Sequence, residues 1–173
     1  MNDAFTEAER QGREIVFGLI SGHCRNYEFT KDRYDKVDLF LTGLSGTQAV
    51  MEIKNRTGYT SYEIDQMGGH IFEYPKFTAL TSYDTYKPIY TVCYPDVCLM
   101  WDVSTITDDS FMEVKNKYPS TTVTHGNKTT KKVTYLQRDK AYILKRNEQL
   151  DRKDSEGKDG GEDNIQHSEE HHG

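Results

Sequence analysis

Hydrophobic and polar positions alternate along this chain with two different periods. Residues 3–21 place apolar side chains close to helical spacing, which predicts an amphipathic helix. A second helix is predicted over residues 60–82, where Pro75 must either kink or restart it, and a short third helix over residues 107–119, where capping residues precede an amphipathic run. Runs rich in β-branched and aromatic residues predict strands at 24–30, 36–42, 47–55, 87–94, 98–103, 131–137 and 140–145.

The order of these elements is one helix, three strands, a second helix and then further strands. Strands that precede and follow a helix in one chain are typical of α+β domains with a mixed sheet. We therefore predict an α+β domain whose central sheet is flanked by helices in an αβββαβ order.

The C-terminal segment has a different composition from the rest of the chain. Residues 147–173 contain no aromatic residue, two large aliphatic residues, nine acids and three bases. Such a segment buries too little apolar surface to offset its ordering entropy, so we expect a disordered acidic tail after a domain that spans residues 1–146. The tail accounts for the whole net charge of −6, so the domain itself is neutral and an anionic partner is not excluded.

Three cysteines and the absence of long apolar runs bear on the compartment. Cys24, Cys93 and Cys98 lie in apolar or aromatic surroundings and lack the spacing of a zinc site, so free thiols in a reducing compartment are expected. The sequence contains no signal peptide pattern and no apolar run of membrane-spanning length. We expect a cytoplasmic protein with no membrane partner, located in the host cytoplasm if it is encoded by a phage.

Residues 36–55 predict a β-hairpin whose register can be derived from its turn. A three-residue loop, Leu44-Ser45-Gly46, requires a left-handed glycine at its last position, which Gly46 supplies. Gly43 then pairs with Thr47, and Leu39 pairs with Met51. A slip by one residue would mix apolar and polar residues on both faces, so the hydrophobic pattern selects this register.

In this register the two faces of the hairpin have different characters. Val37 and Ile53 extend the apolar face, whereas Asp38 lies opposite Glu52 on the other face, with Lys54 next along the strand. Directly opposed residues have Cβ atoms about 5 Å apart, which suits two carboxylates that share one Mg²⁺ or Mn²⁺ ion. The competing interpretation is a weak salt bridge on an exposed face.

The Glu-x-Lys pattern alone carries little information, because it occurs three times. Glu113 and Lys115 fall in the predicted short helix, where residues two apart point in different directions, and Glu156 and Lys158 fall in the tail. The hairpin copy differs because a strand directs both side chains to one face.

An Asp on one strand and Glu-x-Lys on the next, between two helices, resembles the PD-(D/E)XK nuclease superfamily. The resemblance covers roughly residues 3–103 and looks closest to small resolvase-like and phage-encoded members. It implies an α/β/α restriction-endonuclease-like core, and it implies that Asp38, Glu52 and the Ile53 carbonyl bind the metal while Lys54 is the catalytic lysine. Val37 stands where the superfamily often has Pro.

The resemblance also implies further site residues. Many members add a Glu from the first helix, for which Glu14 is the first choice and Glu9 the alternative. Some members use a Gln from the helix after the hairpin, and Gln66 is the candidate. Resolvase-like relatives are often dimers, so a homodimer is a further expectation.

A basic segment near the end of the domain is the candidate nucleic-acid surface, because phosphate contacts require an excess of positive charge. Its residues are Lys128, Lys131, Lys132, Arg138 and Lys140. The competing interpretation is a solvated strand pair that carries lysines without binding anything.

Three functions follow from these observations. The first is a Mg²⁺-dependent nuclease that acts on DNA, including branched or phage DNA. The second is a nuclease-fold protein that binds nucleic acid or a partner protein without catalysis. The third is an accessory phage protein that acts through its acidic tail.

Overall fold

The computed structural model describes residues 3–31, 35–119 and 128–145, so the predicted tail lies outside the described residues. The helices are α1 (Asp3–Ile20), α2 (Ser61–Gln66) and α3 (Tyr74–Thr81), with short 3-10 turns at Ser21–His23, Asp108–Ser110 and Arg138–Lys140. The strands are β1 (Cys24–Phe29), β2 (Leu39–Gly43), β3 (Gln48–Asn55), β4 (His70–Glu73), β5 (Lys87–Cys93), β6 (Val97–Asp102), β7 (Met112–Pro119), β8 (Lys128–Leu136) and β9 (Tyr142–Lys145).

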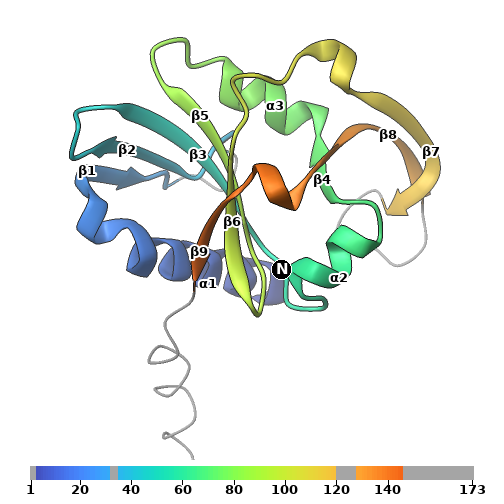
Figure 1. Cartoon of the computed structure of the whole chain (residues 1–173), viewed down its shortest axis with the longest axis horizontal. Coiled ribbons are helices and arrows are strands. Elements are labelled where there is room, and N and C mark those ends of the chain that lie inside the picture. Colours follow the sequence, from blue (N-terminus) through green and yellow to red (C-terminus); the bar gives the residue numbers. More distant parts are fainter. Residues whose placement is uncertain (1–2, 32–34, 120–127, 146–173) are drawn as a thin grey trace, which may run out of the picture.

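Six of the strands form one mixed sheet in the order β1-β2-β3-β5-β6-β9. Strands β3 and β5 are parallel, and the other neighbours are antiparallel. The predicted α+β class with a mixed sheet is therefore confirmed. The parallel pair requires a crossover, and the chain makes it through α2, β4 and α3 (Figure 1).

Helices cover both faces of this sheet. On one face, α1 buries Val16 and Ile20 against Leu39 and Met51 of the hairpin. On the other face, α3 buries Phe77 and Leu80 in a larger cluster that contains Val50, Tyr90 and Trp101. Strand β3 thus lies between two cores, and its successive side chains point alternately toward α1 and toward α3.

The chain after β3 differs from the predicted single helix over residues 60–82. Gly68 and Gly69 have φ values of +108° and +107°, a conformation that ends α2 and that other residues rarely adopt. The chain then forms β4, and a new helix, α3, begins at Tyr74 with Pro75 in its first turn. Proline is tolerated there because the first amides of a helix have no intrahelical acceptor, so Pro75 restarts a helix rather than kinking one.

The predicted helix over residues 107–119 is wrong. Only Asp108–Ser110 forms a 3-10 turn, and Met112–Pro119 forms β7. Strand β7 pairs with β8, which pairs in turn with β4, so these strands make a second, three-stranded sheet. Long-range pairing with β8 overrides the local helical pattern.

Two further sequence-based expectations can be compared with the structure. All three cysteines are free thiols, with Cys93 and Cys98 buried and Cys24 partly buried. Among the helices that the structure describes, none combines the length and the apolar character needed to cross a bilayer.

Candidate functional site

The β2–β3 hairpin has the predicted turn and register. Leu39 pairs with Met51 and Leu41 with Ala49. The Gly43 amide donates to the Thr47 carbonyl at 2.9 Å, and Gly46 has a φ of +88°. The turn chemistry and the alternation of apolar residues were therefore sufficient to fix this part of the fold.

The regular pairing of β2 with β3 begins at Leu39 and Met51. The predicted contact between Asp38, the residue before Leu39, and Glu52 is wrong. The Asp38 amide donates to the Met51 carbonyl at 2.9 Å, and the Ile53 amide donates to Asp38 Oδ2 at 2.8 Å. A side-chain oxygen of Asp38 thus takes the place of a backbone acceptor. This irregularity has the effect of a β-bulge, which re-aims the side chains around it.

The irregularity exchanges the faces of the two residues that precede Leu39. Val37, predicted on the apolar face beside Ile53, instead packs in the cluster on the α3 side. Asp38, predicted beside Glu52, turns toward α1. The residue that follows strand β1 supports this arrangement, because Thr30 donates its amide to the Asp38 carbonyl at 3.0 Å and its hydroxyl to the Val37 carbonyl at 2.8 Å.

Asp38 is 6% exposed and is neutralised by α1. Arg13 Nη2 lies 2.8 Å from Asp38 Oδ1, and Arg13 Nη1 donates to the Thr30 carbonyl at 2.7 Å. The same Nη2 lies 3.6 Å from Glu9 Oε1. Arg13 therefore joins the first helix to the end of β2, with Glu9 at the rim of the cluster.

The structure separates the two candidate acids of the first helix. Glu14, the first choice, is 62% exposed and forms an ion pair with Arg10, so its placement in the site is wrong. Glu9, the alternative, reaches Arg13 beside Asp38. Gln66 is the last residue of α2, is exposed, and makes no hydrogen bond with Asp38, Glu52 or Lys54, so the structure does not bring it to the site either.

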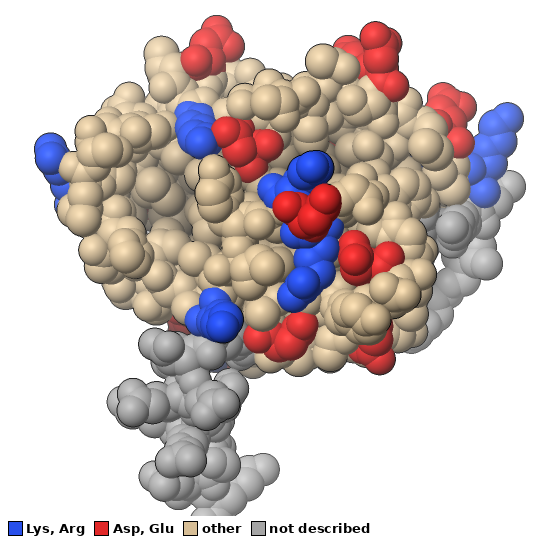
Figure 2. Space-filling view, viewed as in Figure 1, with Lys and Arg blue, Asp and Glu red and all other residues tan. Residues whose placement is uncertain are grey.

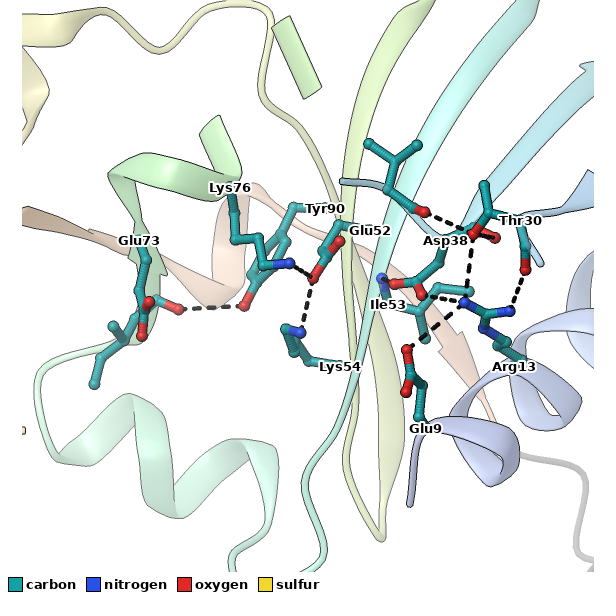
Figure 3. A network of polar contacts seen from close by, with 12 residues as sticks. Glu9, Arg13, Thr30, Asp38, Glu52, Ile53, Lys54, Glu73, Lys76 and Tyr90 are labelled. Atoms are coloured by element: carbon teal, nitrogen blue, oxygen red, sulfur yellow. Dashed lines mark hydrogen bonds and ion pairs between the residues drawn. The ribbon is translucent and has the colours of Figure 1, made fainter. Parts of the chain in front are cut away.

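Glu52 occupies the opposite side of β3 and is 2% exposed. Two amines contact its Oε1 atom, Lys54 Nζ at 2.7 Å and Lys76 Nζ at 2.7 Å. Lys54 follows two residues later on the same strand face, and Lys76 comes from the first turn of α3. Figure 3 shows the two amines converging on Glu52, while Asp38 and Arg13 lie across the strand.

Lys76 is a site residue that the sequence interpretation missed. Pro75 was predicted either to kink or to restart a helix, and the structure confirms the restart, since a Pro in the first turn indicates where a helix begins. The sequence "EYPKF" therefore held a usable signal, since a residue that follows such a Pro lies at a helix start. The partner of Lys76, in contrast, depends on the crossover and could not be read locally.

Tyr90 of β5 pairs in register with Glu52 of β3, and the charges around it change the pKa of its hydroxyl. Burial raises the pKa of Tyr90 well above its usual range, Arg56 acts to lower it, and Glu52 and Glu73 add to the increase. Its hydroxyl donates to the Ile71 carbonyl of β4 at 3.4 Å. Figure 3 shows Tyr90, Glu52 and Glu73 on the side of β3 that lies opposite Asp38 and Arg13.

The predicted basic surface divides into separate contacts. Lys131 Nζ forms an ion pair with Glu73 at 2.7 Å, and Lys132 Nζ lies 3.8 Å from the centre of the Tyr74 ring. Arg138 Nε donates to Ser61 Oγ at 3.3 Å, Lys140 pairs with Asp139 at 3.7 Å, and the side chain of Lys128 lies outside the described part. On the face shown in Figure 2, basic and acidic groups alternate, so that face has no patch of a single sign.

The donor types near the bulge suit a small divalent cation, but Asp38 and Glu52 lie on opposite sides of β3 and do not converge on one ion. Carboxylate and carbonyl oxygens of Asp38, Glu52 and Ile53 are the ligand types that Mg²⁺ takes in proteins, usually with several waters. Within residues 3–31, 35–119 and 128–145, no three or more His, Cys, Asp or Glu side chains are grouped to hold a metal. A cation here would therefore depend on few protein ligands, and it would compete with Arg13 for Asp38.

Comparisons with protein-family models, curated proteins and solved structures found no match for this chain.

Proposed function

We propose that this protein is a metal-dependent nuclease that hydrolyses phosphodiester bonds, with DNA as its substrate, and that its site lies around Glu52. The observation that carries the proposal is a buried carboxylate held by two amines that are each about one-third exposed. One amine would neutralise Glu52. The second leaves one positive charge at the edge of solvent, where a phosphate group of the substrate can approach.

Each side chain has a role that follows from its position. Lys54 and Lys76 would hydrogen-bond the non-bridging oxygens of a phosphodiester and stabilise the extra negative charge of the transition state. Glu52 holds both amines in place until the phosphate arrives, because its burial makes an unpaired carboxylate costly. Asp38, on the α1 side of β3, would hold a Mg²⁺ or Mn²⁺ ion, which when bound supplies an activated water and polarises the phosphate, while Glu52 across the strand holds the two lysines.

The test is cleavage of plasmid, linear and four-way-junction DNA in Mg²⁺ or Mn²⁺. Glu52→Gln should abolish cutting, and Lys76→Gln should slow it by about 10²-fold or more, as expected for the loss of one donor to a developing oxyanion. Glu7→Gln is the matched control, because Glu7 is an exposed partner of Arg10 on α1 and should leave the rate unchanged. Cutting that persists in Glu52→Gln, or in the presence of a chelator, would contradict the proposal.

The contact between Arg13 and Asp38 favours a second candidate, a nuclease-fold protein that binds nucleic acid without cutting it. A guanidinium that already neutralises Asp38 reduces the need for a metal there. This protein would retain DNA in EDTA, cut none of the three substrates, and show no heat of Mn²⁺ binding in calorimetry.

A further inference from the structure

The second sheet brings a lysine of β8 to the edge of the Glu52 site. Strand β4 ends at Glu73, whose carboxylate accepts a hydrogen bond from Lys131 Nζ at 2.7 Å. Tyr90, which pairs in register with Glu52, donates its hydroxyl to the Ile71 carbonyl of the same strand β4 at 3.4 Å, and Glu73 directly precedes the helix turn that carries Lys76. Lys131 therefore lies near the proposed catalytic groups, although β8 belongs to a different sheet and is far from β3 in the sequence.

The charged side chains of this neighbourhood have a positive excess. Lys54 and Lys76 contact Glu52, Lys131 contacts Glu73, and Arg56 follows Lys54 by two residues, so four cations accompany two carboxylates. Arg56 is exposed, and its amide is tied to the Cys93 carbonyl at 2.8 Å, so the backbone that carries its side chain is anchored to β5. Lys131 retains 20% side-chain exposure. Both residues can thus reach a ligand without rearrangement of the fold.

We propose that Arg56 and Lys131 bind the phosphates that flank the scissile one, so that a nucleic-acid backbone runs from the end of β3 across to β8. The inference rests on the proposed function for the position of the scissile phosphate. A chain of phosphodiesters fits better than a single phosphate, because the cations come from three separate segments, around the end of β3, in α3 and in β8.

Lys132 provides the matched control for this proposal. Successive residues of a strand point to opposite faces, so Lys132 turns away from Glu73 and packs over the Tyr74 ring. Lys140, which is 76% exposed and pairs with Asp139, is a second control of the same charge. Both were candidates for nucleic-acid binding in the sequence, and the structure connects neither of them to the Glu52 site.

The experiment measures the affinity of the full chain for a short fluorescein-labelled DNA strand by anisotropy, in EDTA, across a salt series. Lys131→Gln and Arg56→Gln should each weaken binding by roughly 3- to 10-fold and reduce the slope of log K against log salt by about one. Lys132→Gln and Lys140→Gln should change neither quantity, and Lys131→Arg should restore the affinity. A thermal melt of each variant checks that the fold is retained.

The outcomes separate this inference from the nuclease proposal, because binding is measured without metal. If Lys131→Gln reduces the slope of log K against log salt and the protein cuts no DNA, the proposed phosphate contacts are supported and the nuclease proposal is contradicted. If Lys131→Gln binds DNA as tightly as wild type and the protein does cut DNA, the proposed phosphate contacts are contradicted and the nuclease proposal is retained. An equal loss in Lys131→Gln and Lys132→Gln would show general electrostatic attraction and would also overturn it. Inorganic phosphate that displaces the strand from wild type and Lys131→Gln alike would identify a single-phosphate site instead.

Discussion

Removing both amines from Glu52 should destabilise the fold far more than removing Glu52 itself. The carboxylate is 2% exposed, so it cannot recover hydration when Lys54 and Lys76 are replaced by Met. Breaking a buried ion pair by deleting one partner typically costs about 3–5 kcal/mol, and the double substitution should approach this value. Either single substitution leaves one amine at 2.7 Å and should cost only about 1–2 kcal/mol.

Replacing Glu52 and keeping both lysines should cost less stability, because the side chains of Lys54 and Lys76 are 32% and 33% exposed and can turn to solvent. Glu52→Gln should therefore cost about 1 kcal/mol, and adding it to the double Met variant should restore most of the lost stability. Urea unfolding at neutral pH measures these differences as shifts of the midpoint at constant slope. Lys87→Met is the control, since the Lys87–Asp102 pair is partly exposed on both sides and should contribute under about 1 kcal/mol. A double Met variant as stable as wild type would refute the idea that a charged, desolvated Glu52 depends on these two amines.

Three further predictions test other parts of the site and its support. Glu9→Gln should slow DNA cleavage while Glu14→Gln does not, in the same plasmid assay, because Glu9 contacts Arg13 beside Asp38 and Glu14 is exposed. Burial lowers the pKa of His70 from its ordinary value of 6.5, so below that pH the unfolded chain binds a proton that the folded chain does not. The free energy of unfolding should therefore decrease as the pH is lowered below about 6.5, and the urea midpoint of His70→Gln should decrease less over the same pH range. Gly12→Ala should lower the melting temperature in calorimetry despite the better helix propensity of Ala, because its Cβ would lie 3.3 Å from Ile53 Cγ2; a higher melting temperature would show that α1 can move away.

The sequence allowed the hairpin to be predicted up to the residue at which tertiary contacts take over. Alternation of apolar residues and a left-handed Gly46 are local, so the pairing of Leu39 with Met51 follows from them. The apolar alternation continues smoothly through Val37, and nothing in it indicates a change of face. The change depends on Thr30, which follows β1, and on Arg13 of α1, and such contacts become visible only when the chain is folded.

The crossover shows the same limit at the scale of whole elements. The helical pattern over residues 60–82 conceals β4, because a four-residue strand that pairs with β8 has no local signature strong enough to outweigh its neighbours. The error has a functional consequence, since β4 carries Glu73 and leads directly into the helix turn that carries Lys76. Two of the groups around Glu52 were therefore hidden by a single missed strand.

The polar groups on the two sides of β3 differ in net charge, and this difference bears on the proposed chemistry. Toward α1, Asp38 and Glu9 share the guanidinium of Arg13, so these three groups sum to one negative charge. Toward α3, Glu52 is shared by two amines, so those three groups sum to one positive charge. A metal ion is attracted to the first side and a phosphate to the second, and metal-assisted hydrolysis uses both. The Ile53 peptide lies between them, with its amide bonded to Asp38 and its preceding residue Glu52. The turn of Asp38 away from Glu52 therefore separates two attractions that a single mixed cluster would have cancelled.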